Sequence, residues 1–214
     1  MTFHAINKEN WDRTPYFEHY LRQKCTFSLT VNINITRLLE QIRKKGITFY
    51  PTFIHMVSKV VNSHKEFRTC FKDGTLGYWE EMLPSYTIFH SDNKSFSSIW
   101  TEYSDHFHRF YKNYNDDIER YSSIKGLFTK QNEPPNSFPI SMIPWVSFTG
   151  FNLNINEGNS YLLPIITSGK YFKQDSTILL PLSLQVHHAV CDGYHASIFI
   201  EELQHLADDC YEWL

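Results

Sequence analysis

The sequence predicts one domain of the α/β or α+β class, and two observations support this prediction. Apolar residues recur with the period of strands in some segments and of helices in others, and the two kinds of segment intermix along the chain. The 214 residues suffice for one substantial core, and no Gly/Ser-rich or charged linker divides them. We therefore expect residues 1–214 to form a single domain.

The first half of the chain predicts three helices, a strand and a hairpin. In order, the expected elements are a helix from Thr14-Pro15 to about Arg22, a half-buried strand over 27–35, a helix over 37–45 capped by Thr36 and ended by Gly46, and a helix from Pro51. A hairpin over 67–79 is expected to turn at Asp73-Gly74, because that pair tolerates positive φ angles.

The second half predicts further strands and two helices. Strands are expected over 86–90, 96–100, 145–153, 161–171 and 177–186, with a loop at 131–135 and a turn at 156–159. Ser104 or Asp105 opens a helix with an aromatic stripe, a pattern more typical of a core than of a ligand site. A last helix spans 194–209.

Composition argues against several classes of function. A net charge of −3 is not that of a general nucleic-acid binder. No stretch approaches the length of a bilayer span, and the first nine residues lack the apolar region of a signal peptide. The four cysteines form no Cys-x-x-Cys pair, so neither a zinc cage nor a disulfide framework is indicated. We expect a cytoplasmic protein without nucleic-acid or membrane partners.

One stretch carries candidate chemistry: His187-His188-Ala189-Val190-Cys191-Asp192-Gly193, between the last strand and the last helix. Successive side chains on a strand point to opposite faces, so one histidine should face the chemistry while the other packs. A neutral imidazole suits general-base work near pH 7. Asp192 could orient an imidazole or pair with a cation elsewhere. An arbitrary His-His pair is more often simply two satisfied polar residues.

Other kinds of site find little support. His106 and His108 are two apart on an expected helix and face different ways, and no His-Glu-x-x-His spacing occurs, so no metal is expected. There is no Gly-x-Ser-x-Gly elbow and no phosphate-binding glycine loop. Cys191 could be a nucleophile but is equally well explained as a small buried filler.

The unit His-His-x-x-x-Asp-Gly resembles the active-site motif of the coenzyme-A-dependent acyltransferases, and the whole chain resembles the chloramphenicol acetyltransferase family. The further segments that carry this resemblance are Asn10–Arg13, Phe17–Tyr20, Phe49–Pro51, Pro144–Thr149, Phe151–Asn154 and Gly169–Tyr171. The resemblance implies a two-layer sandwich with helices on one face of a mixed sheet. It also implies a homotrimer with each site between subunits, His188 coming from the neighbour of the chain that binds most of the acceptor.

The resemblance further implies direct acetyl transfer from acetyl-CoA to a hydroxyl of chloramphenicol, which confers resistance. His188 would be the general base. Ser141, by composition an ordinary loop serine, would stabilise the oxyanion. Arg13 would form a buried ion pair with Asp192, making Asp192 structural rather than the third member of a triad. No metal or covalent intermediate is required.

Two groups of binding residues are also implied. The acceptor pocket would contain Tyr20, Cys25, Phe96, Phe128, Phe151, Leu153 and Thr167. The coenzyme A side would contain Tyr50, Trp145, Lys170 and Tyr171. His19 replaces a common phenylalanine and Thr48 a usual lysine, so the polarity of the pocket and one phosphate contact depart from the family's pattern.

Two rival functions share parts of this pattern. A dihydrolipoyl acyltransferase core has the same motif, but we expect no lipoyl domain, linker or subunit-binding region in this protein. A binding module that sequesters the antibiotic would not need His188, Ser141, Arg13 and Asp192 intact.

Overall fold

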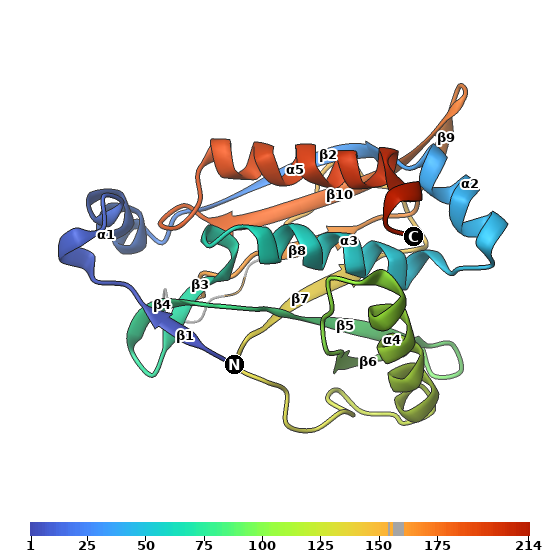
Figure 1. Cartoon of the computed structure of the whole chain (residues 1–214), viewed down its shortest axis with the longest axis horizontal. Coiled ribbons are helices and arrows are strands. Elements are labelled where there is room, and N and C mark those ends of the chain that lie inside the picture. The colour runs from blue at the N-terminus through green and yellow to red at the C-terminus, as the bar shows by residue number, and fades with distance from the viewer. Residues whose placement is uncertain (154, 156–160) are drawn as a thin grey trace.

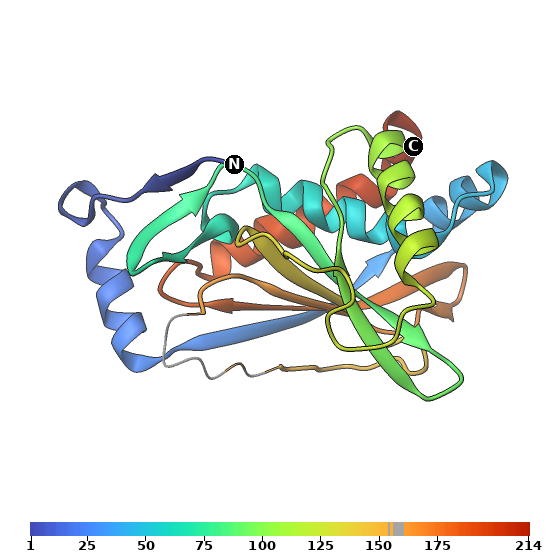
Figure 2. The same cartoon turned by 90° about the horizontal axis from the view of Figure 1, so that it is seen from below.

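The computed structural model describes residues 1–153, 155 and 161–214, in which helices lie on one side of a large mixed sheet (Figures 1 and 2). The strand order is β2-β10-β8-β7-β5-β6, and β9 also pairs with β10. These strands are β2 (Thr26–Asn34), β5 (Leu83–His90), β6 (Ser95–Trp100), β7 (Ser137–Met142), β8 (Ile165–Ser168), β9 (Phe172–Gln174) and β10 (Thr177–His187). Strand β7 runs parallel to both β5 and β8, and the other pairs are antiparallel. The predicted mixed fold class is confirmed.

The main helices of the described chain follow the predicted order. They are α1 (Thr14–Gln23), α2 (Thr36–Lys45), α3 (Phe49–Ser63), α4 (Phe107–Tyr121) and α5 (Gly193–Asp208). Gly46 ends α2 with a φ of 67°, as predicted for a left-handed cap. Helix α3 begins two residues before Pro51. Helix α4 begins later than predicted, because the hydroxyl of Ser104 accepts the backbone N–H of His106 and holds the chain before the helix.

A small second sheet lies near the N-terminus. Its order is β1-β4-β3, formed by β1 (Phe3–Ala5), β3 (Thr69–Lys72) and β4 (Thr75–Trp79). The predicted hairpin turn is confirmed: Asp73 and Gly74 have φ angles of 49° and 78°.

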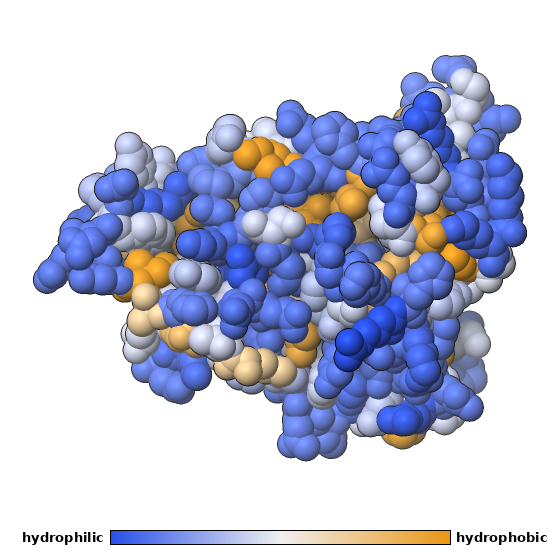
Figure 3. Space-filling view, in the orientation of Figure 1, coloured by the Kyte–Doolittle hydropathy of each residue, from blue (hydrophilic) through white to orange (hydrophobic). Residues whose placement is uncertain are grey.

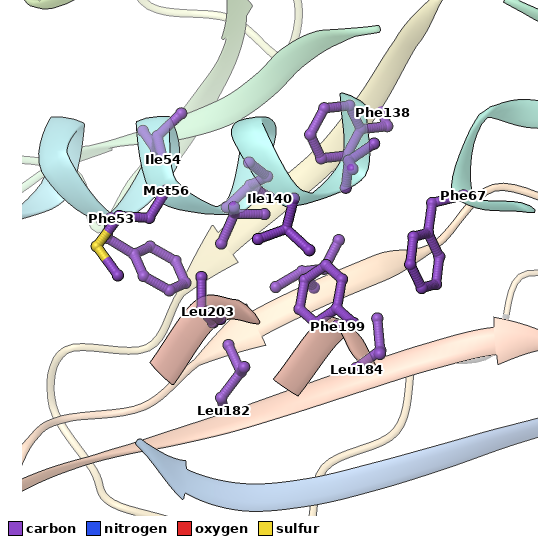
Figure 4. Packing of buried hydrophobic residues seen from close by; sticks show 14 of the residues in the cluster. Phe53, Ile54, Met56, Phe67, Phe138, Ile140, Leu182, Leu184, Phe199 and Leu203 are labelled. Atoms are coloured by element: carbon purple, nitrogen blue, oxygen red, sulfur yellow. The ribbon is translucent and has the colours of Figure 1, made fainter. Parts of the chain in front are cut away.

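The core lies between the large sheet and helices α3 and α5 (Figure 4). Leu182 and Leu184 project from β10 toward Phe199 and Leu203 of α5, and Phe53 of α3 closes the layer. Burying one such side chain contributes about 1.5–3 kcal/mol. Alternation along β10 therefore places Ser183 and Gln185 on the opposite face of the sheet, which we call the second face.

The strand predicted over 145–153 is wrong, and the strand predicted over 161–171 is shorter than expected. Residues 143–153 form no strand, and the segment predicted at 161–171 is a strand only over Ile165–Ser168. Strand β10 already pairs with β2 and β8, so side chains rather than a ladder satisfy the backbone at 151–153. The turn expected at 156–159 lies outside the described residues. Ser141, predicted in a loop, lies in strand β7.

The outside of the molecule carries apolar residues in separate patches among hydrophilic ones on the face shown in Figure 3. Among the described helices, none combines the length and the apolar character that a membrane span requires.

Candidate active site

The two histidines that follow one another at the end of β10 have different environments. His187 is 4% exposed, and its Nδ1 accepts the backbone N–H of Ala189 at 3.1 Å. Burial, together with the neighbouring His188, lowers the pKa of His187. His188 is only partly buried. Because successive side chains of a strand point to opposite faces, one imidazole is packed inside the protein and the other is partly open to solvent.

The ring of His188 is held from two sides. It stacks on Tyr20 with 3.8 Å between ring centroids and 5° between planes, and it meets the edge of Phe27 at 5.2 Å. Its Nδ1 lies 3.0 Å from the carbonyl oxygen of Cys191. A carbonyl oxygen can only accept, so in the neutral ring Nδ1 carries the proton and Nε2 offers a lone pair. In this tautomer Nε2 can accept a proton.

Arg13 fixes the turn that follows His188. Its guanidinium donates to the carbonyl of Ala189 at 2.8 Å, the carbonyl of His188 at 3.1 Å and a carboxylate oxygen of Asp192 at 3.0 Å. One side chain thus binds two successive backbone carbonyls of the turn and anchors the turn to Asp192, the residue that caps α5. Such charge-assisted hydrogen bonds are stronger than neutral ones.

The carboxylate of Asp192 serves the start of α5 rather than the ring of His188. It accepts the backbone N–H of Tyr194 at 3.0 Å and lies 2.9 Å from Nδ1 of His195. Partial burial opposes ionisation, but hydrogen bonding from Arg13 and the charge of His195 hold the pKa of Asp192 below its ordinary value. The pair with Arg13 is less buried than expected, because the two side chains are 16% and 39% exposed in the single chain.

Ser141 lies elsewhere, on the second face of the sheet. Its hydroxyl is 2.8 Å from that of Thr167 on β8, its direct partner in register. Thr167 is in turn opposite Ser183 on β10. Three hydroxyl side chains therefore form a row across β7, β8 and β10.

Within one chain, Ser141 and His188 do not share a site. His188 is five residues beyond Ser183, or about 17 Å along a strand, and Ser183 is two strands from Ser141, or about 10 Å. The two side chains are therefore roughly 20 Å apart. Figure 1 shows the end of β10 near α1, away from β7.

The residues predicted to bind the acceptor also fall into two groups, one near His188 and one near Ser141. Tyr20 stacks on His188, and the carbonyl of Cys25 accepts the backbone N–H of His188 at 2.8 Å. We call these residues and His188 the histidine side. The others lie on or beside the strands of the second face and form the serine side with Ser141: Phe96, Phe128, Phe151, Leu153 and Thr167.

Several apolar side chains of the serine side are open to solvent in the single chain. Phe96 is 53% exposed, Phe128 60% and Leu153 46%. Phe128 follows the carbonyl of Leu127, which accepts the backbone N–H of Ser98 at 2.7 Å. Exposed aromatic and aliphatic groups around two hydroxyls are suited to bind an apolar molecule that carries polar groups.

Three of the four residues predicted on the coenzyme A side are partly or well exposed. Trp145 is 60% exposed and packs against Phe89 at 4.6 Å. Lys170 lies next to the segment that carries Trp145, because the backbone N–H of Lys170 donates to the carbonyl of Val146 at 2.9 Å. Tyr171 meets Phe49 edge-on at 5.8 Å.

Tyr50 differs from these three. Its ring packs against Tyr86 at 6.1 Å, and burial raises its pKa to about 12. Its hydroxyl oxygen is buried, so it does not lie on the surface that carries Trp145.

Thr48 and His19, the two residues that depart from the family's pattern, each contact a tyrosine. Thr48 contacts the hydroxyl of Tyr111 through its backbone N–H at 3.3 Å. His19 meets the ring of Tyr20 edge-on at 5.0 Å.

Within the described residues no three His, Cys, Asp or Glu side chains are grouped so that they could hold a metal.

Two residues of this region were missed in the sequence. His195 completes a capping box with Asp192, and the three-residue spacing of the pair is a signal that could have found it. Gln185 holds the backbone of Leu153, and nothing in the sequence indicates that contact.

Solved structures show which proteins share this fold. A chloramphenicol acetyltransferase aligns with a TM-score of 0.85 at 19% identity, covering 96% of this chain and 100% of that one. A truncated catalytic core of the 2-oxoacid dehydrogenase multienzyme complex from Thermoplasma acidophilum aligns with a TM-score of 0.69 at 14% identity, covering 98% and 97%. The chain thus has the fold of these proteins.

Sequence comparison gives the family. The chloramphenicol acetyltransferase family model matches residues 1–204. A chloramphenicol acetyltransferase from Clostridium butyricum is 59% identical, covering 100% of this chain and 99% of that protein. Another from Staphylococcus aureus is 50% identical over the full length of both. The chain belongs to the chloramphenicol acetyltransferase family.

Proposed function

We propose that this single-domain protein transfers the acetyl group of acetyl-CoA to a hydroxyl of chloramphenicol in the cytoplasm and so inactivates the antibiotic. Family membership supports the acyltransferase class. The observation that carries the mechanism is the fixed imidazole of His188, with Nδ1 on the carbonyl of Cys191 and Nε2 left as an acceptor.

The proposed reaction uses His188 twice. Nε2 removes the proton of the acceptor hydroxyl as its oxygen attacks the thioester carbonyl, and the tetrahedral intermediate forms with a negative oxygen. Collapse breaks the carbon–sulfur bond, and protonated His188 returns the proton to the leaving thiolate. The transfer is direct, and the enzyme forms no covalent bond to the acetyl group.

Ser141 is proposed to donate a hydrogen bond to the oxyanion. Its hydroxyl is oriented by Thr167 at 2.8 Å, which reduces the reorganisation needed in the transition state. The apolar residues of the serine side would hold chloramphenicol. Trp145, Lys170 and Tyr171 would hold acetyl-CoA.

We further propose a homotrimer with sites between subunits. Ser141 and His188 of one chain are roughly 20 Å apart, too far to act on one thioester. A closed ring of copies would bring the histidine side of each chain to the serine side of its neighbour. The exposed apolar groups of the serine side would then be covered.

The test of the activity follows free thiol after mixing the protein with acetyl-CoA and chloramphenicol. Thiol release that depends on chloramphenicol is expected, with acetylated chloramphenicol as the product. Dihydrolipoamide replaces chloramphenicol in a second arm. Turnover with dihydrolipoamide alone would favour the dihydrolipoyl acyltransferase core, and binding of chloramphenicol without thiol release would favour a sequestering module.

The shared site is tested by mixing subunits. His188→Ala and Ser141→Ala proteins are each nearly inactive by this mechanism, and mixed trimers are made by co-expression. Each new site needs the intact histidine from one variant and the intact serine from the other, so about one quarter of the activity should return at random assembly. No recovery would place the whole site within one chain.

A further inference from the structure

The segment that carries Phe151 and Leu153 is held to the sheet by side chains instead of by a ladder. Ser183 donates its hydroxyl to the carbonyl of Phe151 at 2.7 Å. Gln185 accepts the backbone N–H of Leu153 at 3.1 Å and donates to the carbonyl of Leu153 at 2.8 Å. The side-chain amide of Gln185 thus makes the two hydrogen bonds that the backbone of a neighbouring strand would otherwise make to Leu153.

Gln185 has the burial and the partners needed to hold a fixed position. It is 7% exposed, and its oxygen also accepts the hydroxyl of Ser28 at 3.3 Å. Removing this amide takes away both hydrogen bonds that hold the backbone of Leu153 to the sheet. The side chain of Leu153, in contrast, is 46% exposed, so packing within the chain does little to fix it. Its position depends on its backbone.

The held segment lies beside the hydroxyl row of the serine side. Ser183, which binds Phe151, is directly opposite Thr167, and Thr167 contacts Ser141. Phe151 is therefore about two strand spacings, or roughly 10 Å, from Ser141. An apolar segment at that distance from the reacting centre can contact a drug-sized acceptor.

We propose that Gln185 is a positioning residue for chloramphenicol, acting through the backbone of Leu153. This inference rests on the proposed acceptor role of the serine side. Gln185 does not touch the reacting atoms. Its amide sets the place of an apolar wall, so its loss should weaken the productive binding of the acceptor more than that of acetyl-CoA.

The chain contains a matched control. Gln204 of α5 also binds one backbone residue in both directions: it accepts the N–H of Asn34 at 2.9 Å and donates to its carbonyl at 3.0 Å. Asn34 pairs with Leu179, six residues along β10 from Gln185, or about 20 Å. Gln185→Leu and Gln204→Leu therefore remove similar contacts at different places.

The experiment measures steady-state kinetics for both substrates, with thermal melting and size-exclusion elution of each protein. Gln185→Leu is expected to lower kcat/KM for chloramphenicol roughly 10- to 100-fold, mainly through KM, the scale of a displacement of about 1 Å. Its KM for acetyl-CoA should stay near that of the unaltered protein. Gln204→Leu should lower the melting temperature but leave both KM values in place.

Two further variants test whether the change in KM for chloramphenicol arises from the segment that carries Phe151 and Leu153. In the Gln185→Leu background, Leu153→Ala should add little, because a displaced Leu153 has already lost its contact. Ser183→Ala should raise the KM for chloramphenicol in the same direction, and it decides the question if Gln185→Leu does not fold. An unchanged acceptor KM in the folded Gln185 variant, or an equal rise in the Gln204 variant, would overturn the inference. Absence of transfer by the unaltered protein would instead refute the proposed function.

Discussion

Nδ1 of His188 lies 3.0 Å from the carbonyl oxygen of Cys191, three residues further along the chain. The turn that carries the proposed base thus also selects its tautomer, and among the described residues no carboxylate is recorded against this ring. The aspartate of the motif is four residues from His188 but binds Arg13, Tyr194 and His195. The geometry differs from a Ser-His-Asp triad, in which a carboxylate holds the imidazole.

The first prediction concerns the two histidines. His188→Ala should remain folded and lose at least roughly 10²–10⁴-fold in turnover, the usual contribution of a general base. His187→Ala should act mainly on stability, because His187 is buried and binds the backbone of Ala189. Turnover and melting temperature are measured for both. A folded but inactive His187 variant beside an active His188 variant would reverse the assignment.

The second prediction concerns Ser141. Replacing it by alanine should lower turnover about 10²–10³-fold, the cost of one oxyanion donor, with a modest change in substrate affinity. Thr167→Val is a useful companion, because it removes the hydroxyl that contacts Ser141 without removing Ser141. Its loss should be smaller. Near-normal turnover of the Ser141 variant would exclude Ser141 from the mechanism.

The third prediction separates a structural Asp192 from a triad aspartate. Asp192→Asn should cost about 10⁴-fold in turnover if the carboxylate served the imidazole. The observed contacts predict a much smaller loss, together with a lower melting temperature. In a double-mutant cycle, Arg13→Ala and Asp192→Ala should be less damaging together than the sum of the two, by about 1 kcal/mol for a partly exposed pair. Additive losses of stability would contradict the pairing.

The fourth prediction concerns a buried ion pair between α4 and the segment that follows Phe128. Lys130 and Asp117 are 2.7 Å apart, with side chains 13% and 10% exposed, and Asp117 also accepts the hydroxyl of Thr101 at 2.7 Å. Lys130→Met strands the carboxylate and should destabilise the protein by about 3–5 kcal/mol. Lys112→Met, which removes an exposed pair with Asp116 on the same helix, should cost less than about 0.5 kcal/mol. Denaturant unfolding compares the two, and equal costs would show that burial does not matter here.

The fifth prediction is a dependence of stability on pH through His55. Burial lowers the pKa of His55 to about 4, from its ordinary value of 6.5, within an aromatic cluster that includes Phe107 and Trp213. The unfolded chain therefore binds this proton first as pH falls. The contribution of His55 to stability is complete above about pH 6.5 and is lost toward pH 4, by about 2 kcal/mol between pH 7 and pH 5.

His55→Gln provides the comparison, because its side chain does not titrate. The free energy of unfolding of the unaltered protein should fall more steeply between pH 7 and pH 5 than that of the variant. Parallel curves would mean that other groups cause the acid sensitivity.

Local patterns in the sequence determined much of the fold. The apolar alternation before Asn34, the Gly46 cap and the Asp73-Gly74 turn are set by residues close together in the chain, and each is found where it was predicted. The strand before His187 and the helix after Asp192 are also local. These two elements place the proposed base at the end of a rigid support.

The predicted strand that does not form shows the limit of local patterns. Residues 145–153 are apolar enough for a strand, but whether they form one depends on a free neighbouring edge. Strand β10 has no free edge there, so Ser183 and Gln185 supply the hydrogen bonds. Ser141 was predicted in a loop because the short strand β7 is defined by its parallel neighbours β5 and β8.

The sequence by itself determined the fold class and the strand–turn–helix around His188, and through its resemblance it gave the set of candidate site residues. The resemblance also implied the pair of Arg13 with Asp192 and a His188 supplied by a neighbouring chain. The tertiary structure decided other contacts: it placed Ser141 two strands and five residues away from His188 of the same chain, and it joined the backbone of Leu153 to the amide of Gln185. Local propensity depends on neighbours in the chain, whereas these contacts depend on strand order and register, which are set only when the whole sheet has assembled.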